Sequence, residues 1–389
     1  MPDKKLWILF FGRLDDEKWF WLILEMLKMF IKEYGTIPFS FYVFGKWKYV
    51  WELLNLAADH STIHFFGRQP LSTIQRYKEN CHFCLMPSTF LETFWLTALN
   101  SLSMGIPVVW FSKWWLTQFI PNKYDISKSK WENHTQKLYH KITEIVNAYN
   151  ENKINIEQER KNSQNMAKQY TIEKRFENVQ KFIGKPKRIL LVSDFKNKLW
   201  GIETYMHDVK DILESKGYEV KIYWSKIPSW KLWKILKYFG IFLAFGNFID
   251  AIRLRRVVNK FKPKVIRYHS TLRWLGRLPI KNLSSHNSKK IMMYHDLWYF
   301  HPYPSTVCQE NMVYTPLKLS NFIKSANTRN PLSILAICFK YYSVSLLKKH
   351  LIKSMDHHFV PSNFLESIVS KSYQLDPKKV HTLSHFIQK

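Results

Sequence analysis

Short apolar runs alternate with amphipathic stretches along almost the whole chain, and this pattern limits the fold most strongly. In the first half the apolar runs are WILFFG, SFYVFG, TIHFFG, HFCLMP and PVVWF. A second series consists of PKRILLVSDF, YEVKIYW, PKVIRYH, KKIMMYHD, DHHFVPS and KVHTLS. The stretches between the runs have the apolar spacing of helices, for example over 20–34 and 93–104. Such alternation predicts an α/β fold of two Rossmann-like, doubly wound domains, in which helices cover parallel sheets.

A change of pattern near residue 184 separates the two series. Residues 131–182 have helical character with little β-propensity, and the segment FIGKPK (182–187) that follows contains Gly and Pro. Since Gly and Pro end helices, we place the boundary there, with one domain over 1–184 and the other over 185–389. Doubly wound domains of similar size usually bind a ligand in a cleft between them, at the carboxyl ends of the strands.

The chain is strongly basic, with a formal net charge of +29, and most of the excess lies in the second half. Residues 185–389 hold 35 Lys and Arg against 12 Asp and Glu. This asymmetry favours an anionic partner, which could be a membrane face, an anionic substrate or nucleic acid. The alternative is a coding bias toward Lys, with the lysines simply solvated. No nucleic-acid motif accompanies the charge, so no nucleic-acid partner is expected.

Cysteine usage and hydropathy indicate the compartment. Four cysteines in 389 residues do not build a disulfide framework and are typical of a reducing environment. The start MPDKKLWILFFGRL lacks a secretory cleavage pattern, and the most apolar run, 238–249, is shorter than the ~20 residues that span a bilayer. We expect a cytoplasmic protein, with peripheral attachment to the inner face of the plasma membrane as an option. Residues 227–245 fit either a membrane-surface helix or an ordinary amphipathic one.

Two stretches of the first half carry candidate binding residues. In FFGRLDDEKWF (10–20), Gly12 ends a strand, and Arg13 and Lys18 lie near a helix start, where a phosphate or diphosphate would be favoured. Taken alone, this pattern favours a solvated surface loop over an anion site. In MPSTFLETFWLTALNSLSMGIPVV (86–109), Glu92 precedes a predicted helix whose first turn offers free backbone N–H groups. Asn100 follows about two turns along the same face.

Together these stretches resemble the donor site of glycosyltransferase family 4, whose members are retaining enzymes with the GT-B fold. The family pattern runs from a strand ending in Pro-Ser to a Glu, a Phe-Gly-Leu turn, a second Glu and G-x-P-V-V. The resemblance covers residues 5–183, including FGKWKYVWELLNLA and HFFGRQP. It implies a nucleotide-diphosphate sugar as donor, with Arg13 and Lys18 at the diphosphate and Glu92 at the sugar. Further donor contacts are implied for Gly12, Trp95, Leu96, Thr97 and Asn100.

The second half resembles the acceptor domain of the same family. RILLVSDFKNKLWGIETYMHDVKDILESKGYEVKIY looks like its opening strand, its Gly-Gly-x-Glu loop and its first helix. This likeness implies that the loop at Trp200 and Gly201 closes over the donor phosphates. KPKVIRYHS and KIMMYHDLWYF look like strands that end in His and His-Asp at the acceptor cleft. They imply acceptor contacts for His269 and Asp296, and a catalytic role for His295 together with Glu92.

The order of the two domains is inverted relative to the family, in which the acceptor domain comes first. The chain therefore resembles a circular permutant cut at the interdomain linker. In the GT-B fold the final helix crosses back to the first domain, so the old ends lie close together, which makes permutation tolerable. The rival explanation is a misjoining of two neighbouring transferase genes in one reading frame.

Tryptophan occupies positions at which the family pattern has glycine. These positions are Trp19, Trp47, Trp95, Trp114, Trp115 and Trp200. Trp, with 16 residues, also outnumbers Gly, with 11, although Gly is ordinarily about 7% of a protein. We hypothesise a decoding mismatch, in which one codon means Gly in the source but is written as Trp. A second departure is Asn100, which stands where the family has a Glu that binds the ribose.

The sequence predicts a retaining glycosyltransferase that moves a sugar to a lipid-linked or polysaccharide acceptor, without metal or other cofactor. The pair Cys81 and Cys84 lies in an apolar strand pattern, where core packing is favoured over zinc. The alternative function is a catalytically impaired or misjoined protein that only binds sugar nucleotides or carbohydrate. An anionic membrane surface remains a candidate partner.

Overall fold

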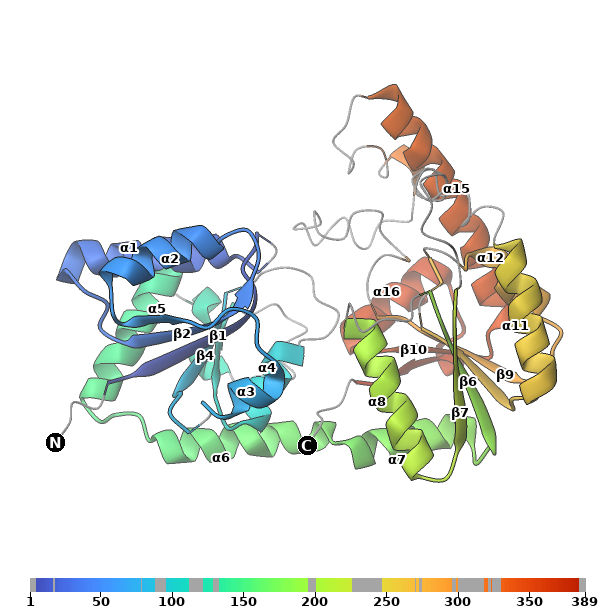
Figure 1. Ribbon diagram of the computed structural model, residues 1–389, viewed down its shortest axis with the longest axis horizontal. Helices are drawn as coiled ribbons and strands as arrows, with labels where there is room; N and C mark the ends of the chain where they lie inside the picture. Colours follow the sequence, from blue (N-terminus) through green and yellow to red (C-terminus); the bar gives the residue numbers. More distant parts are fainter. Residues whose placement is uncertain are drawn as a thin grey trace. The chain divides into compact units, whose positions relative to one another are not determined.

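A computed structural model of the chain describes residues 5–16, 18–77, 79–87, 96–111, 122–128, 133–194, 201–225, 247–269, 271–272, 275–295, 299, 318–320, 323 and 330–384. The chain forms two compact units, and the division between them falls between Thr171 and Ile172. Among the described residues, unit 1 precedes this point and unit 2 follows it (Figure 1). Each unit has its own parallel sheet and its own core.

Unit 1 contains a five-stranded parallel sheet in the order β3-β2-β1-β4-β5. Its strands are β1 (Trp7–Arg13), β2 (Ser40–Lys46), β3 (Ile63–Phe65), β4 (Phe83–Met86) and β5 (Val108–Trp110). Its helices are α1 (Phe20–Tyr34), α2 (Val50–Asp59), α3 (Leu71–Gln75), α4 (Leu96–Ser103), α5 (His134–Asn150) and α6 (Ile156–Ala167). The central strand β1 pairs with β2 on one side and with β4 on the other.

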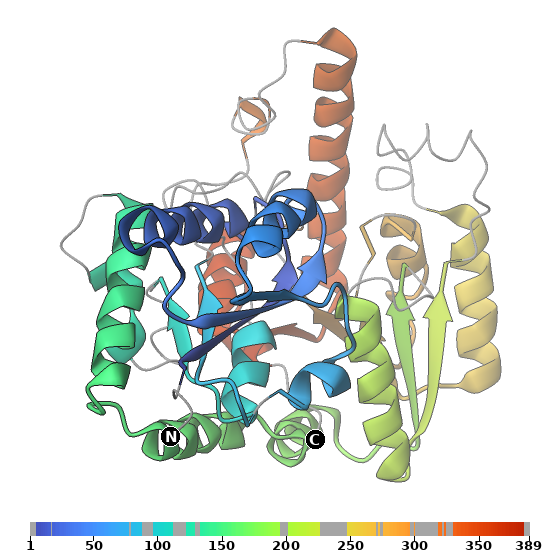
Figure 2. The same cartoon turned by 60° about the vertical axis from the view of Figure 1, so that its left-hand side comes forward.

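The main core of unit 1 lies between the sheet and helices α1 and α5. Alternate residues of β1, such as Ile8 and Phe10, are buried against apolar residues of α1, such as Phe20 and Leu27. Burial of each such side chain stabilises the fold by roughly 1.5–3 kcal/mol. Helices α4 and α6 lie on the opposite side of the sheet from α1 (Figures 1 and 2). The sheet is therefore covered on both faces, as parallel sheets require.

Unit 2 contains a six-stranded parallel sheet in the order β11-β10-β9-β8-β6-β7. Its strands are β6 (Arg188–Ser193), β7 (Glu219–Trp224), β8 (Val265–Tyr268), β9 (Lys289–Met293), β10 (His357–Val360) and β11 (Val380–Thr382). Its helices are α7 (Ile172–Ile183), α8 (Gly201–Ser215), α11 (Phe248–Phe261), α12 (Arg277–Asn282), α15 (Pro331–Ser354) and α16 (Asn363–Tyr373). The predicted fold class of two doubly wound α/β domains is confirmed.

Helix α7 belongs to unit 2, although the predicted boundary at 184/185 assigns it to the first domain. The buried guanidinium of Arg175 on α7 donates hydrogen bonds to the Tyr205 hydroxyl and to the Ser384 carbonyl oxygen. Phe182, also on α7, packs edge-on against Phe359 of β10, with ring centroids 5.3 Å apart. These contacts between α7 and the sheet of unit 2 place the division at Thr171, before α7.

Two of the tryptophans at family glycine positions have backbone conformations that favour glycine. Trp19 immediately precedes α1 in the left-handed region, with φ 53° and ψ 36°. Trp47 has φ 129°, a value that side chains with a Cβ adopt only under strain. The structure therefore agrees with the glycine pattern at both positions. Trp95, Trp114, Trp115 and Trp200 lie outside the described residues.

Two smaller predictions concern cysteines and membranes. Cys81 and Cys84 are buried, and burial raises the pKa of each thiol to about 12, so neither thiol ionises readily. Among the described residues, no helix combines the length and the apolar character needed to cross a bilayer.

Candidate functional site

The predicted donor residues of unit 1 that the structure describes lie at the switch point of its sheet. The chain passes from β1 to β2 on one side of β1 and later enters β4 on the other side. Connections on opposite faces leave a crevice beyond the carboxyl ends of such neighbouring strands, where doubly wound domains bind ligands. Gly12 and Arg13 end β1, and α4 follows β4 in the chain. The sheet thus brings both predicted stretches to the same edge.

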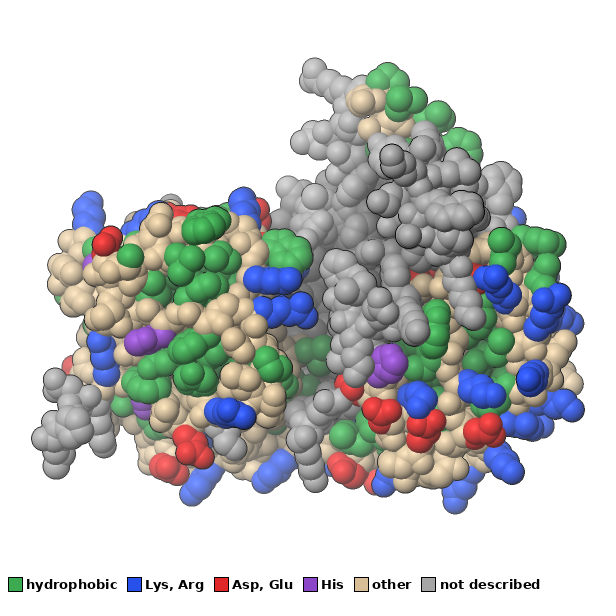
Figure 3. All heavy atoms as spheres, viewed as in Figure 1, with side chains coloured by type: hydrophobic (Ala, Val, Ile, Leu, Met, Phe, Trp, Pro, Cys, Tyr) green, Lys and Arg blue, Asp and Glu red, His purple; other side chains and the backbone are tan. Residues whose placement is uncertain are grey.

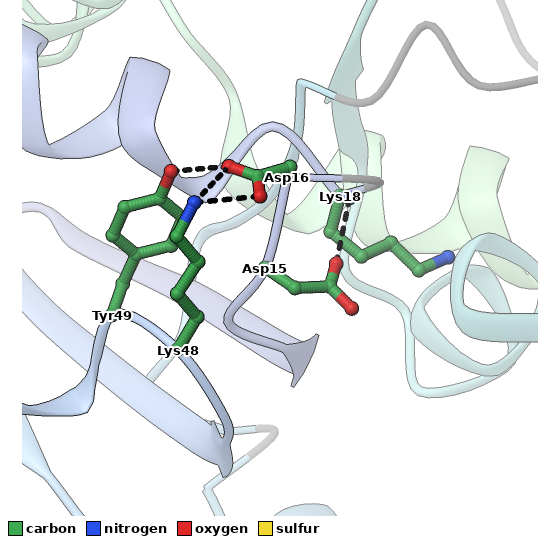
Figure 4. A network of polar contacts seen from close by, with 5 residues as sticks. All are labelled: Asp15, Asp16, Lys18, Lys48 and Tyr49. Carbon is green, nitrogen blue, oxygen red and sulfur yellow. Dashed lines mark hydrogen bonds and ion pairs between the residues drawn. The ribbon is translucent and has the colours of Figure 1, made fainter. Parts of the chain in front are cut away.

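The turn from β1 to α1 is held by a network around Asp15 and Asp16 (Figure 4). The buried Asp15 carboxylate accepts a hydrogen bond from the Lys18 backbone N–H at 3.0 Å and pairs with the Arg13 guanidinium at 3.0 Å. Asp16 accepts from Lys48 Nζ at 2.7 Å and from the Tyr49 hydroxyl. These bonds fix the path of the turn, so the backbone around Lys18 is preorganised.

The charges of this turn are partly balanced. The hydrogen bond from Lys48, followed by that from Tyr49, lowers the pKa of Asp16. Because Asp16 and Lys48 are both exposed, solvent screens their ion pair, which therefore adds little to stability. The Arg13 side chain remains 41% exposed while it pairs with Asp15, so it can still reach an anion at the sheet edge.

Glycines followed by cations lie at or just beyond the carboxyl ends of three neighbouring strands of unit 1, a regularity that the sequence-based prediction used only at β1. The pairs are Gly12-Arg13, Gly45-Lys46 and Gly67-Arg68, on FFGR, VFGK and FFGR. Gly45 lies opposite Gly12 in the parallel register. A Cβ at Gly45 would lie 2.1 Å from the Gly12 carbonyl oxygen, so this close approach requires glycine. The repeated Gly-cation pair was the available signal for Lys46 and Arg68.

Helix α4 carries the other described donor candidates. Leu96 and Thr97 form its first turn, and Asn100 lies one turn further on, half-buried. The Asn100 carbonyl oxygen accepts from Ser103 Oγ at 2.7 Å. The free N–H groups of the first turn favour an anion. The candidates Glu92 and Trp95 lie outside the described residues.

In unit 2, the predicted acceptor residues also lie at a switch point, beside β8. Strand β6 pairs with β7 on one side and with β8 on the other. His269 directly follows β8, and His295 follows the neighbouring strand β9. The two imidazoles are stacked, and His269 Nδ1 lies 2.9 Å from His295 Nε2. The candidate Gly201 begins α8, whereas Trp200 and Asp296 lie outside the described residues.

The bond between the two imidazoles restricts their protonation. One of the two bonded nitrogens must donate and the other must accept, so at least one ring is neutral. Burial, followed by the charges of Arg267 and Arg175, lowers the pKa of His295 well below its ordinary value of 6.5. At neutral pH His295 is therefore an uncharged hydrogen-bonding group, suited to orienting a sugar hydroxyl.

A buried cluster of Arg175, Tyr205 and Arg267 lies beside the histidine pair. The Arg267 guanidinium donates to the Tyr205 hydroxyl at 3.0 Å, and Arg175 donates to the same oxygen. The Tyr205 ring lies edge-on to the His295 ring, with centroids 5.1 Å apart. Burial alone would raise the pKa of Tyr205, but the two guanidiniums outweigh burial and lower it. The sequence signal was Arg267 itself, a charged residue inside the apolar strand VIRY.

Unit 2 should lose stability at acid pH because of His358. Burial, followed by nearby cations, lowers the pKa of His358 to about 3, and its Nδ1 lies 3.0 Å from the Tyr294 hydroxyl. Below pH 6.5 the unfolded chain binds a proton there that the folded chain does not. The free energy of unfolding should therefore fall by about 3 kcal/mol between pH 6.5 and 4.

Urea titrations across this pH range measure the effect. His358→Asn should remove this part of the pH dependence and leave the part that His295 contributes, because Asn retains a polar atom near Tyr294 but does not titrate. His60→Asn, at a half-buried histidine of unit 1, is the matched control, because it lies outside unit 2 and should not change the unfolding of that unit. An equal slope in the wild type and in His358→Asn would contradict the assignment.

Comparison with known proteins gives one match to a family model. The model described as "Glycosyl transferases group 1" matches residues 5–120, and the described residues of this range lie within unit 1. No curated protein matches the chain.

Solved glycosyltransferase structures resemble parts of the chain. Pneumococcal O-GlcNAc transferase GtfA, in complex with UDP and GlcNAc, is 23% identical with TM-score 0.38, covering 47% of this chain and 37% of GtfA. A mutant of S. aureus TarM, in complex with Fondaparinux, alpha-GlcNAc-glycerol and UDP, is 17% identical with TM-score 0.36. The match covers 47% of this chain and 36% of TarM. The catalytic domain of Helicobacter pylori cholesterol-alpha-glucosyltransferase is 15% identical with TM-score 0.31. The match covers 43% of this chain and 99% of that domain.

At these identities and TM-scores, the structural likenesses carry no argument about activity. The chain spans 37% of the length of GtfA and 36% of that of TarM. The family match instead coincides with the edge described above, since residues 5–120 include Gly12, Arg13, Lys18 and α4. Unit 1 is therefore similar to the glycosyl transferases of group 1 over residues 5–120.

Proposed function

We propose that the protein is a retaining glycosyltransferase of family 4 type, which transfers a sugar from a nucleotide-diphosphate donor to a lipid-linked or polysaccharide acceptor. The main support is the coincidence of the group 1 match with the β1/β4 switch point, the edge of the sheet that Arg13, Lys18 and α4 share. In this proposal unit 1 binds the donor and unit 2 binds the acceptor. Neither half requires a metal or another cofactor in this mechanism.

The chemistry of the donor half follows from its cations and backbone. As the glycosidic bond to the diphosphate breaks, negative charge develops on the leaving phosphate oxygen. Arg13 and Lys18 would stabilise that charge, and the turn held by Asp15 reduces the reorganisation needed. Glu92 would bind the donor sugar, the first turn of α4 would contribute N–H groups, and Asn100 would contact the ribose without charge.

The chemistry of the acceptor half depends on the histidine pair. A neutral His295, held by His269, would orient a sugar or acceptor hydroxyl by hydrogen bonding, without adding charge. Asp296 and the loop at Trp200 and Gly201 would complete this half. The domain order would be that of a circular permutant, in which α7 is the family helix that crosses back to the acceptor domain. The contacts of α7 with unit 2 agree with this assignment.

The sequence has Trp where the proposed donor pocket needs glycine. Replacing these tryptophans by glycine therefore tests the proposed function most directly. Donor hydrolysis and transfer are compared between the chain as written and a variant with Trp95→Gly, Trp114→Gly, Trp115→Gly and Trp200→Gly together. We expect turnover to rise roughly a hundredfold in the variant, corresponding to about 2.7 kcal/mol of barrier, because indoles would no longer fill donor volume. NMR of the product should show retention at the anomeric carbon.

Charge substitutions in the same background test the donor half. Arg13→Ala and Lys18→Ala should each lower kcat/KM roughly tenfold to a hundredfold, because each removes a cation from the leaving group. Lys28→Ala is the matched control, since Lys28 is an exposed lysine further along α1 that pairs with Glu25 and Glu52, outside this network. If neither the written chain nor the glycine variant turns over a nucleotide sugar, the alternative holds. The protein would then be an impaired or misjoined GT-B chain that at most binds sugar nucleotides or carbohydrate.

A further inference from the structure

Helix α11 exposes apolar side chains at its first turns and cations further along. Phe248 is 67% exposed, Ile249 is 47% exposed, and Ile252 is also exposed. At 100° per residue, Arg253, Arg256 and Lys260 lie on the same outward half of the helix, and all are exposed. The inward half is buried through Leu254, Val258 and Phe261. The exposed face therefore changes along the helix axis from apolar to cationic.

Helix α15 has the same arrangement on its exposed stripe. Leu332, Leu335, Phe339 and Tyr342 recur at helical spacing over its first three turns and are 40–63% exposed. Lys349 and Lys353 continue the stripe toward the C-terminal end, and both are exposed. Scattered single exposed apolar residues are ordinary, but two helices of one unit with the same graded pattern form a defined surface.

The apolar ends of the two helices lie at the same end of unit 2. Helix α11 leads into β8 and α15 leads into β10, and both strands belong to one parallel sheet. Each helix therefore runs opposite to its strand and begins near the carboxyl edge of the sheet. Helix α12 packs against both α11 and α15. The resulting surface, here called the α11/α15 face, lies at the edge that carries His269 and His295.

The charge around this face is almost entirely positive. Between Asp250 and Asp356, the sequence contains Asp296 and Glu310 as its acidic residues. Asp250 itself is buried, where it accepts hydrogen bonds from Tyr223 and Asn247. Figure 3 shows apolar side chains at the outer end of α15 and cations over the flank of unit 2. A partner that binds this face must therefore accommodate its apolar side chains and present negative charge to its cations.

We propose that the α11/α15 face docks unit 2 onto an anionic lipid bilayer. The apolar ends, Phe248 and Ile249 on α11 and Leu332 and Leu335 on α15, insert at the headgroup boundary. The cations further along each helix contact the lipid phosphates, as in interfacial helices with apolar anchors and basic flanks. A second copy of the chain would bring like charges together, and nucleic acid would not use the apolar ends.

Docking itself does not depend on sugar transfer. The consequence for the acceptor rests on the proposed function, since a lipid-linked acceptor would then be presented at the edge with His269 and His295. Binding to vesicles is measured without nucleotide sugar, and donor hydrolysis is measured without vesicles. Failure of one proposal is thereby distinguished from failure of the other.

The test is flotation of the full chain with vesicles of 70% phosphatidylcholine and 30% phosphatidylglycerol, against vesicles of phosphatidylcholine alone. We expect binding to the anionic vesicles that weakens as salt rises. Phe248→Ser with Ile249→Ser, and separately Leu332→Ser with Leu335→Ser, should each lower the partition coefficient at least about tenfold. Arg253→Gln with Arg256→Gln should lower it roughly tenfold or more and reduce its salt dependence.

The matched control is Tyr34→Ser with Trp51→Ser, which removes exposed aromatics of unit 1, 51% and 78% exposed, and should leave binding unchanged. Circular dichroism of every variant checks that the fold is retained. Binding that is indifferent to the α11 and α15 substitutions would overturn the proposal. A dimer that dissociates on Phe248→Ser with Ile249→Ser, or oligonucleotide binding with the same residue dependence, would overturn it in favour of those partners.

Discussion

Gly45→Ala is expected to lower the free energy of unfolding of unit 1 by about 3 kcal/mol or more. The added Cβ would lie 2.1 Å from the Gly12 carbonyl oxygen and equally close to Leu14 Cδ1. The backbone of β2 cannot easily move away from β1, because hydrogen bonds hold it on both sides. The Gly45 N–H donates to the Gly67 carbonyl oxygen at 2.8 Å, and the Leu14 N–H donates to the Lys46 carbonyl oxygen at 3.1 Å. The two strands must separate at the sheet edge to accept a methyl group.

Urea titration of the variant measures this loss. Gly35→Ala is the control for backbone strain without a steric clash, since Gly35 has a positive φ of 69° and a Cβ there would meet nothing within 4 Å. Its cost should be the backbone strain alone, roughly 1 kcal/mol. Equal shifts of the two unfolding midpoints would show that the contact between Gly12 and Gly45 is not limiting.

Trp47→Gly is expected to raise the free energy of unfolding by about 1–3 kcal/mol, against the usual effect of shortening a large side chain. The gain comes from the backbone, because φ 129° is available to glycine without strain. Little packing is lost, since the indole is 53% exposed and Lys46 Nζ lies over it, 5.4 Å from the ring centroid.

Trp51→Gly, four residues later, provides the control. Trp51 is 78% exposed but lies in the first turn of α2, where glycine costs up to roughly 0.5–1 kcal/mol relative to a helix former. The two variants should therefore shift the unfolding midpoint in opposite directions. A decrease for both would remove the structural support for glycine at position 47.

Trp19 gives an intermediate case that sharpens the decoding hypothesis. Its backbone is left-handed, but its ring lies 5.0 Å from the His134 ring and 6.3 Å from that of Phe111. Strain relief and lost packing should nearly cancel in Trp19→Gly.

Mass spectrometry of the native protein tests the decoding hypothesis directly, since peptides spanning position 95 should contain Gly. Trp in those peptides would refute it.

The strands could be predicted from the sequence because they are buried on both faces. The runs WILFFG and IMMY are almost wholly apolar, and β1 and β9 overlap them. The positions of Gly12, Arg13, His269 and His295 follow from the same pattern, because each lies where an apolar run ends. Parallel pairing then collects these residues at one edge within each sheet.

Tertiary contacts account for what could not be predicted. Helix α7 continues a helical pattern that begins in α5 and α6, and nothing local marks the change of partner at Thr171. That change depends on Arg175 contacting Tyr205 and Ser384, which are distant in sequence. The bond between His269 and His295 likewise depends on β8 lying beside β9. The functional roles of Glu92, Asp296 and the other candidates remain predictions.

The position of α7 has a consequence for recombination between relatives of this protein. A crossover at residue 184 would transplant a unit 2 that lacks Arg175 and Phe182. Tyr205 would lose one of its guanidinium donors, and Phe359 would lose an aromatic neighbour. A crossover after Thr171 would carry the helix along with the sheet that it covers. The segment that can be exchanged as a folded unit therefore begins at Ile172. Chimaeras of homologues joined at this point should fold more often than chimaeras joined within FIGKPK (182–187).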